Sequence, residues 1–261
     1  MIASIVTELR KVATTRLWWI LLVLMVLMVA GTAGLVAVSV ALTSEEEEIL
    51  FAPEIAYSMA AGIGYVFTLS VGTLAVTAEY RHQTITPTFL ADPNRVRVVA
   101  GKALGQFLVG LGYGVAATFG VAVVVGGLFA VTGNPTFLGD GDVLRAFVLQ
   151  PLALALWALV GVGVGALIRN QIAAIVVIVA FNQLVDPFLR LGLAAADLDG
   201  VAKFLPTSAS DAMAGGGFAG LLSPAGEAEI LAWWNGGLVM VLYAVVFLAM
   251  GWGLSLRRDV S

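Results

Sequence analysis

Few side chains in this sequence are suited to catalysis or metal binding, and their types exclude several classes of protein. Cysteine is absent and His82 is the single histidine, so thiolate and histidine-rich metal centres are not expected and a Ser–His catalytic pair is disfavoured. The one Gly-Lys pair, Gly101 and Lys102, has Val96 where the first glycine of a phosphate-binding loop would stand. The sequence therefore predicts that the chain is not an enzyme and binds no metal or cofactor of its own.

The densest group of charged and polar residues lies at 79–102, which read EYRHQTITPTFLADPNRVRVVAGK. Residues 84–90 form a modestly apolar run that could lie along a membrane as a short helix, and Asp-Pro-Asn at 92–94 is typical of a turn. Basic residues follow at Arg95, Arg97 and Lys102. Two interpretations remain open: a basic loop that contacts anionic lipid, or a docking element for a cytoplasmic partner.

The elements that position this segment must be membrane helices. The chain of 261 residues is 60% hydrophobic and 11% charged, whereas soluble domains are about 45–50% apolar and about 25% charged. A membrane-spanning helix needs about 20 apolar residues. The sequence predicts an all-α membrane protein with a single transmembrane domain, residues 1–261, and six spans at about 17–42, 56–78, 103–131, 146–168, 171–190 and 230–256.

The distribution of charge predicts how these spans are oriented. With six spans both termini lie on one side, which carries ten of the thirteen basic residues, whereas thirteen of the seventeen acidic residues fall on the other side. Since cytoplasmic loops are enriched in Lys and Arg, we expect a multi-pass protein of the cell membrane with both termini cytoplasmic. The net charge of −4 disfavours nucleic acid as a partner. The partner expected around the spans is the lipid bilayer.

The first sixteen residues predict an interfacial helix that precedes the first span. Apolar residues from Ile2 to Val12 recur at helical spacing, and charged residues occupy the other face. The residues singled out on this interfacial helix are Glu8, Lys11 and Arg16.

Polar residues are scarce within the spans. A Ser or Thr there can bond to a backbone carbonyl, so each is either a packing residue or a candidate for the substrate pathway or for a contact between subunits. The candidates are Thr73, Thr77, Asn182 and Gln183. No carboxylate lies near the middle of a span, which disfavours an ion-coupled carrier. Asp186 and Arg190 have the spacing of a helical salt bridge and are expected to form a structural pair. Trp157 is the one tryptophan far from a span end.

Glycines recur at four-residue spacing at 101 and 105, 110 and 114, and 161 and 165. Such pairs let helices approach closely. Residues 191–232, between the fifth and sixth spans, are expected to lie as short helices over the outer end of the bundle, as an extracellular re-entrant region.

The whole chain resembles the membrane subunit, or permease, of ABC transporters of the ABC-2 type. The resemblance begins with the amphipathic N-terminal helix and the six spans, and Leu205, Pro206, Thr207 and Asp211 resemble the family's outer re-entrant region. It rests most on the segment after the second span, with Glu79, Tyr80, Arg81, Thr84, Leu90, Pro93, Arg95 and Lys102. Asn94 stands between the proline and Arg95, where the family's pattern often places the basic residue directly after the proline.

This resemblance implies a function. Residues 79–102 would hold a coupling helix that docks on a separate ATPase subunit, residues 1–16 would form the connecting helix beside it, and ATP and Mg would bind to the partner. Two permease copies, or one copy and a related permease, would assemble with two ATPase subunits and export a hydrophobic or amphipathic compound such as a drug, lipid or glycan-like molecule. The alternative is a six-span membrane scaffold or immunity-type protein that transports nothing.

Overall fold

The computed structural model describes residues 2–42, 53–84, 95–196, 198–216 and 231–253. Most of the described residues are helical, and six of their helices are long and apolar enough to cross a membrane. The expected all-α membrane fold is therefore confirmed. The helices are α1 (Ile2–Thr14), α2 (Leu17–Leu42), α3 (Pro53–Tyr57), α4 (Met59–Arg81), α6 (Arg95–Thr132), α7 (Gly141–Leu167), α8 (Gln171–Ala180), the π-helical segment η1 (Phe181–Val185), α9 (Asp186–Ala195), α10 (Asp199–Ala202), α11 (Pro206–Ala214) and α13 (Trp233–Gly251).

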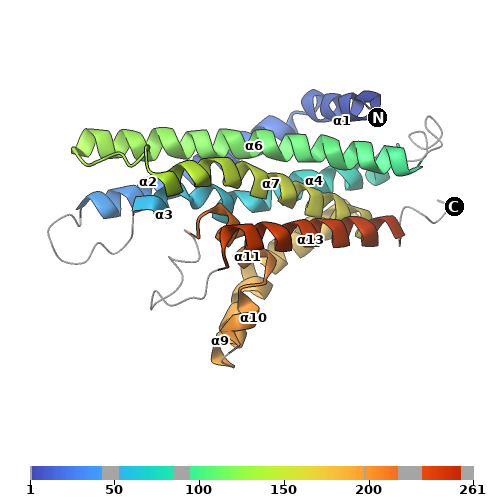
Figure 1. Ribbon diagram of the computed structural model, residues 1–261. Helices are drawn as coiled ribbons and strands as arrows, with labels where there is room; N and C mark the ends of the chain where they lie inside the picture. The colour runs from blue at the N-terminus through green and yellow to red at the C-terminus, as the bar shows by residue number, and fades with distance from the viewer. Residues whose placement is uncertain (1, 43–52, 85–94, 197, 217–230, 254–261) are drawn as a thin grey trace.

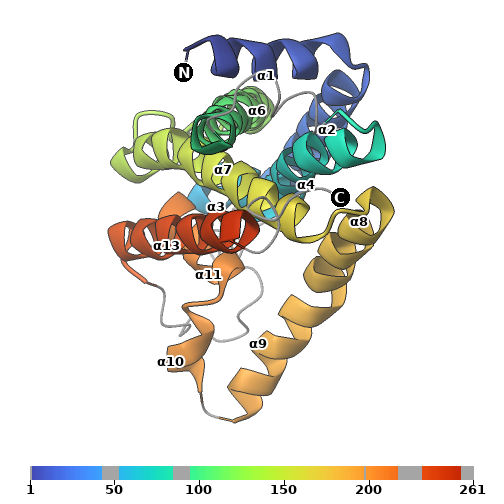
Figure 2. The same ribbon diagram turned by 90° about the vertical axis from the view of Figure 1, so that its right-hand side faces the viewer.

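Helix α7 lies at the centre of the bundle and packs against α4, α6 and α13 (Figure 2). Its glycines permit this packing: a Cβ placed on Gly161 would lie 2.2 Å from the Leu69 carbonyl oxygen of α4. On α6, a Cβ on Gly110 would lie 2.8 Å from the Ala158 Cβ of α7, and one on Gly114 would lie 2.4 Å from Pro151 Cα. The close helix contacts predicted from the glycine spacing are confirmed at these positions.

The third long helix begins earlier than the sequence suggested. Helix α6 starts at Arg95, well before the expected boundary at residue 103, and α4 continues to Arg81. The expected loop at 79–102 is thus helical at both ends, and the basic residues from Arg95 to Lys102 belong to the helix. A charge count cannot place this boundary, because a helix continues past the apolar layer wherever its charged residues find partners.

The fifth span continues past its proline through an irregular turn. Pro187 has no N–H to donate to the carbonyl of Gln183, and its ring crowds that carbonyl. The Asp186 N–H instead bonds to the Phe181 carbonyl, five residues back, which gives the π turn η1 before α9 continues to Ala195. Helices α8 and α9 form an arm that contacts the bundle mainly through α4 and slants away from it (Figure 2).

The region before the last span contributes α10 and α11. Helix α11 starts with Pro206 at its first turn and ends at Gly215, whose φ of 114° a side chain would oppose. It packs against α13, α7 and α4, and most of its residues are buried. The expected short helices at 191–232 are therefore present among the described residues, and α11 is part of the bundle.

Candidate functional site

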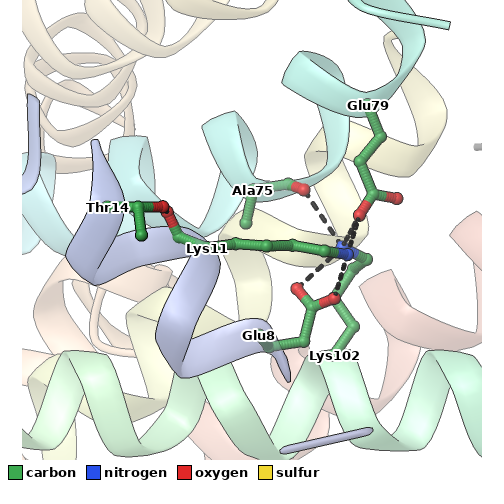
Figure 3. A network of polar contacts seen from close by, with 6 residues as sticks. All are labelled: Glu8, Lys11, Thr14, Ala75, Glu79 and Lys102. Atoms are coloured by element: carbon green, nitrogen blue, oxygen red, sulfur yellow. Dashed lines mark hydrogen bonds and ion pairs between the residues drawn. The ribbon is translucent and has the colours of Figure 1, made fainter. Parts of the chain in front are cut away.

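Four charged side chains from three helices meet at the end of the bundle where α1 lies (Figures 1 and 3). Lys11 Nζ donates to Glu8 Oε1 and to Glu79 Oε1, each at 2.7 Å. Lys102 Nζ donates to Glu8 Oε2 at 2.9 Å, to Glu79 Oε1 at 2.8 Å and to the Ala75 carbonyl oxygen at 3.1 Å. We call Glu8, Lys11, Glu79 and Lys102 the charge cluster.

The charge cluster is electrically balanced, and three of its four members are buried, whereas the Lys11 side chain is 42% exposed. Glu8, Glu79 and Lys102 each expose 7% or less of their surface, and two carboxylates face two ammonium groups. Burial raises the pKa of the Glu8 carboxyl, but Lys102 and Lys11 outweigh it, and the pKa lies below its ordinary value. Burial lowers the pKa of Lys11, but Glu79 and Glu8 outweigh it, and that pKa is raised. Removing one of the three buried members would leave an uncompensated buried charge, which costs about 3–5 kcal/mol.

Two glycines of α6 let α1 come close enough to form the cluster. A Cβ on Gly101 would lie 2.6 Å from Ser4 Cβ, and a Cβ on Gly105 would lie 2.8 Å from Glu8 Cβ. Their four-residue spacing places both on one face of α6. This glycine pair therefore seats the interfacial helix against a span and brings Glu8 within reach of Lys102.

Helix α1 is also joined to the start of α2. The Trp18 indole donates to the Ala13 carbonyl oxygen at 3.2 Å, and the Tyr113 hydroxyl of α6 donates to the Trp18 carbonyl oxygen. A displacement of α1 would therefore act on α2 and α6 through backbone contacts as well as through the charge cluster.

Tyr80 and Arg81 contact a different part of the bundle from Glu79. The Arg81 Nη1 donates to Gln171 Oε1 at 3.2 Å, and the Arg169 guanidinium lies 5.6 Å from the centre of the Tyr80 ring. The last turn of α4 therefore contacts α1 and α6 on one side and the α7–α8 connection on the other.

The other predicted coupling residues lie outside these contacts. Leu90 and Pro93 lie outside the described residues, and Thr84 is the last described residue after α4. Arg95 is the first residue of α6. Arg16 is exposed in the bend between α1 and α2.

A cavity of about 560 Å³ lies between α4, the α8–α9 arm and α11, away from the charge cluster. Its apolar lining includes Met28, Val66 and Val179, and its polar lining includes Asn182 and Gln183 of the π turn. The two polar residues predicted in the fifth span therefore face a common space. π turns within helices occur frequently at functional sites.

A hydrogen-bonded triad lines the same cavity. Arg190 Nε donates to Asp186 Oδ2 at 3.0 Å, as the spacing predicted. Thr207 of α11 donates to Asp186 Oδ1 and accepts from Arg190 Nη2, each at 2.6 Å. This triad fixes α9 to the first turn of α11.

Thr73 and Thr77 do not line this cavity. Thr73 donates to the Gly161 carbonyl oxygen of α7 at 3.0 Å, and Thr77 donates to the Thr73 carbonyl oxygen at 3.1 Å. Both are buried in the contact between α4 and α7.

Sequence reasoning missed part of the cavity wall. The Trp157 indole donates to Ser210 Oγ of α11 at 2.8 Å, and its ring lies 4.7 Å from that of Tyr65, which lines the cavity with Ser210. The position of Trp157 in the middle of a span was a signal of a buried indole that needs an acceptor.

Comparison with models of known protein families gives a match over nearly the whole chain. The model of the ABC-2 family transporter proteins matches residues 2–260. The chain belongs to this family. The predicted resemblance is therefore confirmed, and the family match together with the six apolar helices identifies a membrane permease. A search of curated proteins finds no match to the chain.

Proposed function

We propose that this ABC-2 permease is the membrane-spanning subunit of an ATP-driven exporter of a hydrophobic or amphipathic compound. The observation that carries the proposal is the charge cluster, which joins α1 to both helices that flank residues 82–94. Buried ion pairs between separate helices hold those helices in a fixed relation. A force applied to residues 82–94 would therefore move α1, α4 and α6 together.

The source of that force is a separate ATPase subunit that docks on the cytoplasmic segment within residues 79–102 and binds ATP and Mg. ABC-2 permeases generally work with such subunits. The exposed Arg81 and Arg16 flank this surface and offer positive charge to a partner.

A second permease, identical or related, completes the assembly along the α8–α9 arm. The arm carries apolar side chains that are exposed in the single chain and recur at helical spacing: Ile172, Val176, Leu184, Phe188 and Leu191. This places the π turn and the cavity close to the contact between the two permeases, where a compound would cross.

In this proposal the chain is a cell-membrane protein whose two termini both lie in the cytoplasm. Helix α1 and the end of α13 lie at the same end of the bundle (Figure 1), and the basic residues of the sequence gather there. The cavity, with its apolar and polar walls, suits an amphipathic cargo.

Purification of the tagged permease in mild detergent from its native membrane, with identification of bound soluble proteins, tests this function. We expect an ATPase to be recovered with the intact chain and to be lost when residues 84–95 are replaced by a neutral linker. Replacement of residues 43–52, which follow α2 in the sequence, is the matched control and should keep the ATPase bound. Folded permease that carries no ATPase would contradict the proposal and favour a scaffold.

A further inference from the structure

A second space lies on the face of the bundle that carries α1, away from the α8–α9 arm (Figures 1 and 2). It is a groove of about 330 Å³ between α1, α2 and α6. Leu9 and Val12 line it from α1, Leu22 lines it from α2, and Val109 lines it from α6. Its walls are therefore two spans and the interfacial helix beside them.

The lining of this groove is suited to hydrocarbon. Among the described residues that line it, the two polar side chains already have acceptors: the Trp18 indole donates to the Ala13 carbonyl oxygen at 3.2 Å, and the Tyr113 hydroxyl donates to the Trp18 carbonyl oxygen. Gly112 leaves room, because a Cβ there would meet no atom within 4 Å. The groove therefore offers apolar surface, which binds a ligand by removing that surface and the ligand's own from water or detergent.

An arginine lies next to the groove. Arg16 stands in the bend at residues 15–16, between Ala13 and Trp18, which both line the groove. The side chain is exposed, and within the described part of the chain it has no hydrogen bond or ion pair. Lys11, by contrast, is bonded within the charge cluster. Arg16 thus places a positive charge beside an apolar groove.

The order of these features along the chain follows the depth of a bilayer. Trp18 and Trp19 are in the first turn of α2, and amphipathic rings at the end of a span lie at the membrane interface. Arg16 precedes them, and Leu22 lies one turn further into the span. The charge is therefore at the depth of lipid headgroups, and the groove continues from there into the hydrocarbon layer.

We propose that this groove binds an anionic phospholipid, with the phosphate on Arg16 and one acyl chain between α1, α2 and α6. The inference goes beyond the proposed function, because it concerns the bilayer rather than the cargo. A second permease is placed along the α8–α9 arm, so the face with α1 is left to the lipid. The bound lipid joins the interfacial helix to two spans on the side where the charge cluster does not reach.

Native mass spectrometry of the purified permease in detergent tests the headgroup contact. Dioleoyl phosphatidylglycerol is titrated against dioleoyl phosphatidylcholine, which has the same chains and no net charge. We expect the anionic lipid to bind more tightly and Arg16→Gln to raise its Kd by about fivefold, the effect of one basic residue near an anionic lipid. The Kd of phosphatidylcholine should not change. Arg10→Gln is the matched control, an exposed arginine of α1 outside the groove lining; an equal effect of the two variants would overturn the site.

Filling the groove tests the chain contact. Gly112→Phe should raise the Kd of both lipids by at least about tenfold, because the exclusion of even two methylene groups costs that much affinity. Gly127→Phe is the matched control, since it lies on the same helix and its Cβ also meets nothing within 4 Å. A loss shared by Gly127→Phe, or no loss in folded Gly112→Phe, would overturn the groove as the site.

A measurement on the unmodified chain keeps the test informative if Gly112→Phe misfolds. Phosphatidylglycerol with a photoreactive diazirine in its acyl chain should label residues 9–13 or 109–113, and labelling confined to other helices would overturn the proposal. Arg16 also borders the surface offered to the ATPase. A contact with that protein would be insensitive to Gly112→Phe, so loss of the lipid site and failure of the exporter assignment are distinguishable.

Discussion

Replacing Lys102 with methionine removes one charge from the centre of the charge cluster while keeping a side chain of similar length. In the native chain the ammonium group contacts Glu8 at 2.9 Å and Glu79 at 2.8 Å. The variant leaves two carboxylates and Lys11, which contacts both at 2.7 Å. The cluster changes from neutral to a net charge of −1.

The expected loss of stability follows from the burial of these groups. Breaking a buried ion pair by removing one partner costs about 3–5 kcal/mol. Lys11 still compensates part of the charge, so we expect the lower limit, about 3 kcal/mol. For a chain of this size each kcal/mol lowers Tm by about 2–4 °C, which gives a decrease of about 6–12 °C.

Thermal unfolding of the purified permease in detergent, followed by tryptophan fluorescence, measures this decrease. Arg10→Met on the exposed face of α1 is the matched control and should change Tm by about 2 °C or less. A Lys102→Met variant as stable as the Arg10→Met control would show that the charge cluster does not hold α1 on the bundle.

The same cluster predicts a dependence of stability on pH. The Glu8 pKa is lowered from 4.5, so the stability due to its ionisation is full above 4.5 and is lost as pH falls through the lower folded value. The Lys11 pKa is raised from 10.5, so its contribution is full below 10.5 and is lost as pH rises through the folded value. Glu8→Gln should flatten the acid side of a plot of Tm against pH; an unchanged acid side would contradict the assignment.

Three further predictions concern packing and topology. Gly105→Ala should lower Tm by several degrees, because its Cβ would lie 2.8 Å from the Cβ of Glu8 on α1. Gly112→Ala, with nothing within 4 Å of its Cβ, should leave Tm unchanged or slightly raised. Equal effects of the two substitutions on Tm would refute the close approach of α1. Thr207→Val should destabilise by about 1–3 kcal/mol, since it leaves the α9 ion pair without its hydroxyl, and Thr207→Ser should restore Tm, a rescue whose failure would argue against the triad. Because the chain lacks cysteine, single-cysteine variants at Asn134 and His82 report topology: a membrane-impermeant maleimide added to intact cells should label position 134 and not 82, and the reverse pattern would invert the proposed orientation.

Much of the fold could be predicted from composition, because a span is recognised by length and hydropathy and both are local properties. The six spans and their tight glycine contacts followed directly. The start of α6 at Arg95 could not be predicted, because it depends on the ion pairs of Lys102 with Glu8 of α1 and Glu79 of α4. The π turn was not predicted from the sequence. A proline disfavours a regular helix, but the continuation into α9 depends on tertiary contacts such as the hydrogen bond from Thr207 of α11 to Asp186.

Each residue of the charge cluster was singled out from the sequence, but the contacts among the four residues were not predicted. Helical periodicity places Glu8 and Lys11 on one face of α1, three residues apart. Their contact with Glu79, 68 residues from Lys11, depends on the packing of α1 against α6. Tyr80 and Arg81 were grouped with Glu79 by sequence, and successive residues of a helix point in different directions, so they contact Arg169 and Gln171 instead.

The most direct test of the proposed function is a cross-link between the segment at 79–102 and the ATPase. A single cysteine at Leu90, in the otherwise cysteine-free chain, is reacted with a short heterobifunctional cross-linker in native membranes, and the product is identified by mass spectrometry. Asn134→Cys, at the opposite end of the bundle, is the control. We predict a cross-link from position 90 to a nucleotide-binding protein and none from position 134. Efficient labelling of position 90 without any cross-linked ATPase would contradict the docking role of this segment.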